Sequence, residues 1–191
     1  MIGRAMKTNL MQFRLPRALS RFAADRRGVS AVEFAMLLPL MVTLYLGGVE
    51  VSQGIGIDRK VTLTTRTVAD LASQVSNITN ADMTNILNAS TSVISPYPAG
   101  QLKIVISCLK IDSNGKATVE WSDAKNGTAR AKGSGVTLPS ALAVPSTSLI
   151  YSEVSYSYKP VIGYVITGTL SLADEIYMRP RLSDTVTRSA T

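Results

Sequence analysis

The sequence lacks the side chains on which most enzymes and metal sites depend. It has 191 residues, no histidine and a single cysteine. The absence of histidine removes the commonest general base and the commonest metal ligand. One cysteine forms neither an intramolecular disulfide nor a cysteine-rich zinc site. We therefore expect no catalytic residues, no cofactor and no metal, and we expect Cys108 to be a small buried side chain.

Charge is also scarce, and it is unevenly placed. Charged residues make up 17% of the chain, which has a formal net charge of +7. Residues 1–28 contain seven cations and one anion, whereas residues 29–191 contain 13 cations and 12 anions. The globular part is thus nearly neutral and has no basic face with interleaved aromatic residues, which argues against nucleic-acid binding.

The longest uncharged stretch follows this basic tract. Residues 29–49 read VSAVEFAMLLPLMVTLYLGGV, and Glu33 is their one charged side chain. A helix of this length spans about 30 Å, which is one hydrocarbon core. Pro39 predicts a kink in a membrane helix and not its end. The positive-inside rule places residues 1–28 in the cytoplasm and the residues after the span on the other side of the membrane.

Two other readings of this stretch are weaker. A buried helix of a soluble core leaves the seven flanking cations unexplained. A cleaved secretory signal peptide usually has a shorter basic region and a small-residue cleavage site, and GGVEVSQGIGI after the apolar core contains no clear site of that kind.

The helical pattern continues beyond the membrane segment. Residues 57–76 have a weak apolar stripe at helical spacing, preceded by a flexible QGIG sequence at 53–56. Thr79 or Asn80 caps a shorter second helix, which SPYP at 95–98 terminates. We expect four parts: a basic leader at 1–28, a transmembrane helix at 29–49, a helical stalk and second helix at 50–95, and a sheet-containing head at 96–191.

The head changes to the period of two that is typical of strands. Residues 102–111 and 116–121 flank DSNG, which is a hairpin signal. In the second of these strands, alternation predicts that Ala117, Val119 and Trp121 share one face, so Trp121 should lie in the core between sheet and helices. Residues 148–160 and 169–181 supply two further strands, and in the first of them Ile150, Val154, Tyr156 and Tyr158 point to one face. Residues 123–146 read as a long surface loop. The predicted fold is α+β, with a long N-terminal helix, a short second helix and a small antiparallel sheet of three to five strands that has helices on one face.

Few residues of the chain are arranged in a way that suits catalysis. A serine–lysine pair is the one nucleophilic arrangement that the composition allows, but no S-x-x-K or G-x-S-x-G motif occurs in a recognisable setting. The carboxylates of the head are scattered and read as solvated surface charge. A membrane-anchored hydrolase therefore stays a weak alternative.

One motif stands above this background, RRGVSAVEF at residues 26–34. Gly28 follows two arginines at the edge of the apolar helix, and Glu33 lies inside that helix. An ionised carboxylate in hydrocarbon costs several kcal/mol unless it is paired or reaches the headgroups. If the chain is cut after Gly28, Val29 acquires an α-amino group with which Glu33 of a neighbouring subunit could pair.

This motif resembles the type IV prepilin signal, with the cut between Gly28 and Val29, Glu33 at the fifth mature position and Phe34 at the sixth. The wider segment 28–53 resembles the TadE-like pseudopilins of the tight-adherence (Tad) pilus, and residues 154–163 and 178–181 resemble other stretches of TadE-like chains more weakly.

The resemblance implies a non-enzymatic minor pilin-like protein of the bacterial inner membrane that acts in pilus biogenesis, adhesion and biofilm formation. Its implied partners are a separate prepilin peptidase, other Tad pseudopilins, the Flp-type major pilin, inner-membrane platform proteins and the lipid bilayer. The main alternative is an uncleaved signal-anchored envelope protein with a periplasmic binding domain.

Overall fold

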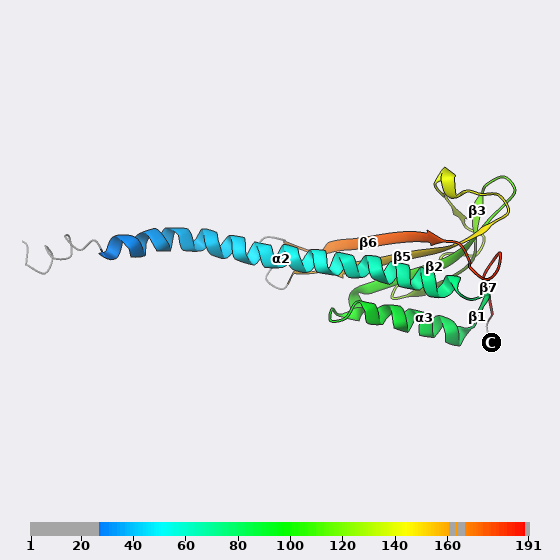
Figure 1. Ribbon diagram of the computed structural model, residues 1–191, viewed down its shortest axis with the longest axis horizontal. Helices are drawn as coiled ribbons and strands as arrows, with labels where there is room; N and C mark the ends of the chain where they lie inside the picture. The colour runs from blue at the N-terminus through cyan, green and yellow to red at the C-terminus, as the bar shows by residue number, and fades with distance from the viewer. Residues whose placement is uncertain (1–26, 161–162, 164–166, 190–191) are drawn as a thin grey trace, which may run out of the picture. The chain divides into compact units, whose positions relative to one another are not determined.

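A computed structural model describes residues 27–160, 163 and 167–189 (Figure 1). The chain divides into two compact units, residues 1–44 and 45–191. Of the predicted basic leader, residues 1–26 lie outside the described residues. The four-part division predicted from the sequence stays a prediction.

The first described element is the long helix α2, Arg27–Ser73, which continues through Pro39 without ending. In the second unit this helix turns an apolar stripe inward: Ile57, Val61, Val68 and Ala72 are at most 1% exposed. The spacing of these residues matches the helical period, so they form one face that packs on the sheet. The predicted long N-terminal helix is confirmed.

The second helix, α3, Asn80–Val93, begins where the sequence predicted. The Thr79 hydroxyl accepts a hydrogen bond from the Asp82 amide at 3.2 Å, and the Asp82 carboxylate accepts one from the Thr79 amide at 3.0 Å. This reciprocal capping box satisfies two amides that have no partner inside the helix. The hydrogen bonds from Thr79 lower the pKa of Asp82.

The head contains a five-stranded antiparallel sheet of order β4-β3-β2-β5-β6 (Figure 1). Its strands are β2 (Leu102–Ile111), β3 (Ala117–Lys125), β4 (Gly135–Val136), β5 (Ser148–Tyr158) and β6 (Leu170–Met178), with short 3₁₀ turns η1 (Ala99–Gln101) and η2 (Ser140–Leu142). The α+β class and the antiparallel sheet are therefore confirmed.

A second, two-stranded sheet was not predicted. The strand β1 (Asn77–Ile78), between the two helices, pairs in parallel with β7 (Thr187–Arg188) near the C-terminus. Two residues are too few to show a period, and the partners are about 110 positions apart in the chain. No local signal in the sequence could have revealed this pairing.

The two faces of the large sheet are covered differently. The face that packs on α2 and α3 contributes Ile104, Ile106, Ile150, Val154 and Tyr156 to the main core. The opposite face has a smaller cluster made by Leu109, Ile111, Ala117, Val119, Leu149 and Tyr151, with Val136, Leu138 and Leu142 packed on it. The helices therefore lie on one face, as expected, and the chain after β3 covers part of the other.

The predicted shared face of Ala117, Val119 and Trp121 is wrong. A register shift lets Cys108 pair with Trp121 and Leu109 pair with Val119, so that Glu120 is an extra residue, a β-bulge. Trp121 consequently belongs to the helix-side core, whereas Val119 belongs to the cluster on the opposite face. The expectation that Trp121 is part of the sheet–helix core is nevertheless confirmed.

Residues 123–146 are more ordered than the predicted surface loop. The strand β3 extends to Lys125, and β4 adds a short edge strand that pairs with Ala117 and Thr118. Between them, the Arg130 guanidinium donates two hydrogen bonds to the Glu153 carboxylate, at 2.7 and 2.9 Å. Glycine- and serine-rich composition indicated a loop here, but packing on the sheet decides its course.

Candidate functional site

The residues predicted to carry function lie at the start of α2. Gly28 has no atom within 4 Å of an added Cβ, and Val29 and Phe34 are 54% and 57% exposed. Val29 and Glu33 are four residues apart on a helix, so they lie on the same side of it, one turn apart. Arg26, the first residue of the motif, lies outside the described residues.

Glu33 is exposed on this helix. Among the residues that the structure describes, none forms a hydrogen bond or ion pair with its carboxylate. The surface around it is apolar and also exposed, and includes Val32, Met36 and Leu37. A carboxylate in such a setting requires water, lipid headgroups or a cation from another molecule.

The apolar helix is compatible with a membrane span. Between residues 28 and 73 it is long and apolar enough to cross a membrane, and none of its most apolar 18-residue window is buried. The Thr43 hydroxyl donates a hydrogen bond to the Pro39 carbonyl at 2.8 Å. This is the usual bond of a helical threonine to the carbonyl four residues before it, and it does not replace the amide that Pro39 withholds from the Ala35 carbonyl. The helix nevertheless continues on both sides of Pro39. The predicted kink stays a prediction.

Near the start of the second unit, α2 has a buried polar contact with the end of β5. Glu50 is only 2% exposed. The Tyr158 hydroxyl from the end of β5 lies 3.5 Å from the Glu50 carbonyl and 3.4 Å from the Gln53 amide oxygen. Burial, followed by the charge of Glu50, raises the pKa of Tyr158. This contact ties β5 to α2 one turn beyond the predicted span.

The glycines of the QGIG segment have a packing role. A Cβ added to Gly56 would lie 3.1 Å from the Tyr97 hydroxyl oxygen, a tighter approach than a side-chain carbon normally makes. The helix runs through this segment without interruption. Close approach of Tyr97 therefore accounts for a glycine that the sequence alone indicated as a flexible point.

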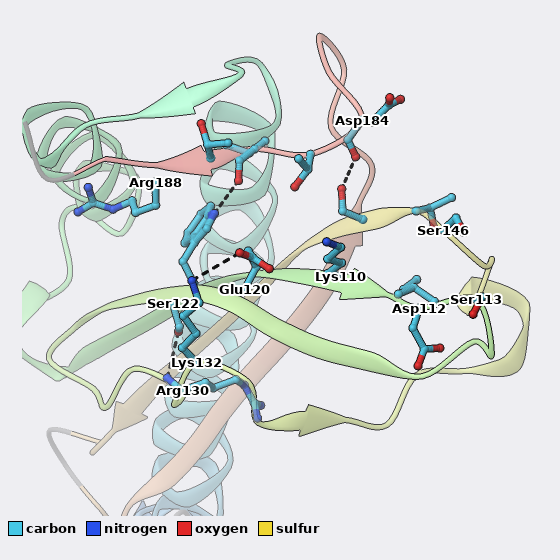
Figure 2. A pocket seen from close by; sticks show the side chains of 17 residues that line it. Lys110, Asp112, Ser113, Glu120, Ser122, Arg130, Lys132, Ser146, Asp184 and Arg188 are labelled. Atoms are coloured by element: carbon cyan, nitrogen blue, oxygen red, sulfur yellow. Dashed lines mark hydrogen bonds and ion pairs between the residues drawn. The ribbon is translucent and has the colours of Figure 1, made fainter.

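A cavity of about 980 Å³ lies in the head between the β2–β3 hairpin and the chain at 184–188 (Figure 2). Two of the cations that line it have ion-pair partners: Lys132 pairs with Glu120 at 3.5 Å, and Arg188 pairs at 2.9 Å with Asp123, which lies outside the lining. The Ser148 hydroxyl donates to the Asp184 carbonyl. No described serine of this cavity hydrogen-bonds a lysine amine, so the geometry gives no support to a serine–lysine hydrolase.

The C-terminal chain closes the inner side of this cavity through an interaction that the sequence did not reveal. Trp121 is 8% exposed, and its indole Nε1 donates a hydrogen bond to the Val186 carbonyl at 2.6 Å. The Cys108 thiol, 3.8 Å from the Thr185 hydroxyl, is fully buried, as predicted, and burial raises its pKa. The Trp121 contact depends on the β-bulge that turns this side chain toward the helices, whereas Cys108 lies on β2, which pairs regularly with β5.

The family of TadE-like proteins has a sequence model that matches residues 28–70. The match confirms the resemblance predicted from the sequence, and it covers the apolar helix and most of the part that packs on the head. No curated protein and no solved structure matches the chain.

Proposed function

We propose that this TadE-like chain is a minor pilin-like component, or pseudopilin, of the Tad pilus apparatus, which a prepilin peptidase cleaves between Gly28 and Val29. The family match associates the chain with the Tad pilus. The cleavage, the minor-pilin role and the partners are the parts that we propose.

The observation that carries the proposal is the place where the family match begins. It starts at Gly28, the residue that the prepilin-like motif places just before the cut. Glycine has no Cβ and permits the closest approach of a peptidase to the backbone. Gly28 lies next to the beginning of α2 at Arg27, and the ends of helices fray readily.

Glu33 has the role of an assembly residue in this proposal. Cleavage gives Val29 a charged amine, and Glu33 has no partner among the described residues of its own chain. A neighbouring subunit would bring its Val29 amine to this carboxylate within the membrane. Because an unpaired charge is costly there, the pair would favour one register between adjacent helices.

The placement in the membrane follows from the same residues. Residues 1–28 carry six net positive charges and would stay in the cytoplasm, while the exposed apolar part of α2 spans the inner membrane. The head would then be periplasmic, where it could contact other pseudopilins and the Flp-type major pilin. Platform proteins of the inner membrane would meet the helix. Through these contacts the chain would act in pilus biogenesis, adhesion and biofilm formation.

The experiment that tests the cleavage is N-terminal sequencing and intact-mass measurement of the protein from cells with and without the prepilin peptidase. We expect the mature chain to begin at Val29 when the peptidase is present and to retain residues 1–28 when it is absent. Gly28→Val and Gly28→Leu should also retain the leader.

Gly48→Val provides a matched control. Gly48 lies on the same helix and, like Gly28, has no atom within 4 Å of an added Cβ. We expect this variant to be cleaved as efficiently as the unchanged chain. If the unchanged chain keeps its leader in the presence of the peptidase, it is a signal-anchored envelope protein instead. Normal cleavage of Gly28→Val would show that the cut lies elsewhere.

A further inference from the structure

One edge of the head sheet is open over the whole length of a strand. In the order β4-β3-β2-β5-β6, the nine-residue strand β6 is at the end and pairs with β5 alone. No described residue outside this pair forms a backbone hydrogen bond with β6. An edge of this kind presents a row of amide and carbonyl groups to which another strand can add.

The residues whose backbone groups face this open edge can be identified. The Glu175 amide donates a hydrogen bond to the Asp174 carboxylate at 2.9 Å, so this amide points away from β5. Backbone groups of an antiparallel strand alternate between its two sides. Ser171, Ala173, Glu175 and Tyr177 therefore direct their amides and carbonyls outward. Their cross-strand partners on β5 include Ser155 and Glu153, which belong to the face away from the helices. The Asp174 carboxylate already accepts the Glu175 amide, so an added strand would displace this carboxylate.

A hollow of about 700 Å³ lies on that same face and reaches β6. Its lining includes the small residues Ser155 and Ala173, together with Glu153, Asp174 and Glu175. Lys103 lies across it, and Arg130 pairs with Glu153. On β6 itself both charged residues are acidic. The Glu175 carboxylate also accepts a hydrogen bond from the Tyr151 hydroxyl at 2.6 Å, and both carboxylates of the edge strand line the hollow.

The charges disfavour pairing of β6 with the β6 of a second copy. An antiparallel two-fold arrangement centred on the strand would place Asp174 opposite Asp174 and Glu175 opposite Ala173. Like charges directly across a strand pair are destabilising. A strand that carries lysine or arginine at these positions instead gains a favourable cross-strand pair.

We propose that β6 is a docking edge for an extended, lysine- or arginine-bearing segment of another protein, which adds as a sixth strand and places a cationic side chain beside Asp174 and Glu175 at the hollow. The backbone row provides affinity, and the two carboxylates select the charge of the partner. The inference depends on the head alone and stands whether or not the chain is cleaved at Gly28.

The test uses the full chain in nanodiscs of zwitterionic lipid and labelled, end-blocked nine-residue peptides. One peptide alternates threonine with valine and lysine, and a second has glutamate in place of lysine. A third keeps the lysines but is N-methylated at alternate backbone nitrogens. We expect fluorescence anisotropy to show roughly tenfold tighter binding of the lysine peptide than of the glutamate peptide. N-methylation should abolish binding, because it removes the amides that pair with β6.

Two variants distinguish recognition by the β6 carboxylates from a general attraction of the lysine peptide to acidic residues of the head. The double variant Asp174→Asn, Glu175→Gln should remove the preference for lysine, whereas Glu120→Gln, an acid on a different strand, should leave it unchanged. Equal binding of the lysine and glutamate peptides, binding of the N-methylated peptide, or equal effects of the two variants would each overturn the proposal. A concentration-dependent dimer that Ala173→Pro dissociates would also overturn it, in favour of pairing between two copies.

Discussion

Replacing Trp121 with alanine tests the packing of the head most directly. The side chain is 92% buried and lies in the core shared by the sheet and both helices. Truncating a buried aromatic ring of this size costs about 3–5 kcal/mol. The Val186 carbonyl, whose residue is fully buried, would also lose the indole donor at 2.6 Å. Because small domains are stable by about 5–15 kcal/mol, we expect Trp121→Ala to remove a large part of the free energy of unfolding of the head.

Trp121→Phe separates the hydrogen bond from the ring. It keeps a large aromatic ring in the core while it removes the Nε1 donor and part of the indole volume, so we expect a smaller loss than for alanine, about 1–2 kcal/mol. Trp121 is the chain's one tryptophan, so its fluorescence reports unfolding of the unchanged protein, and circular dichroism serves for the variants. Denaturant titration of the full chain in detergent micelles gives the free energies, and proteolysis reports release of residues 182–189.

The β-bulge predicts which pairs of substitutions have coupled effects on the free energy of unfolding. Trp121 and Val186 lie in one cluster, so their alanine substitutions should couple by about 1 kcal/mol or more. Trp121 and Val119 lie on opposite faces, so their effects should add. Full stability of Trp121→Ala with a protected C-terminal segment would refute the packing, and strong coupling of Trp121 to Val119 would refute the bulge.

Further changes test the bulge, the membrane residue, the helix cap and the topology. Deleting Glu120 should leave Trp121 buried and the head folded, because the strand pairs on both sides of this extra residue keep their register; an exposed indole fluorescence would contradict this. Glu33→Gln should leave insertion and cleavage intact but reduce the number of pili seen by electron microscopy, whereas Glu33→Asp should retain more of them; normal piliation of Glu33→Gln would argue against the pairing role. The lowered pKa of Asp82 means that its stabilisation of α3 is present above its ordinary pKa and lost as the pH falls through the folded value, so acid titration should affect the stability of the unchanged chain more than that of Asp82→Asn. A reporter that is active only outside the cytoplasm should be active when fused after Thr191, and an inactive fusion would reverse the proposed orientation.

Local signals in the sequence determined most of the elements. The uncharged run and its basic flank predicted the long helix, because a membrane selects for length and apolarity and these properties are readable from composition. The sequence predicted that Thr79 or Asn80 caps α3, because capping depends on the residue type next to the helix, and the structure assigns the cap to Thr79. Alternation predicted β5 and β6, and Ile150, Val154, Tyr156 and Tyr158 all belong to the main core, as the period of two required.

The prepilin-like motif could likewise be read from the sequence, because its residues are contiguous and belong to one helix. The structure adds that Val29, Glu33 and Phe34 are all exposed on α2. The motif therefore reaches the proposed function through spacing and chemistry, and the experiments on Gly28 and Glu33 test it.

Only the tertiary structure decided which way Trp121 faces. Strict alternation placed it with Val119, but one unpaired residue, Glu120, reverses the faces on its two sides. Nothing in the residues themselves marks this insertion, because a bulge is defined by the register of two strands and not by the composition of one. The pairing of β1 with β7 and the open edge at β6 are also relations between distant segments. Sequence periodicity describes how each segment meets a core, whereas the identity of its neighbours emerges only when the segments pack together.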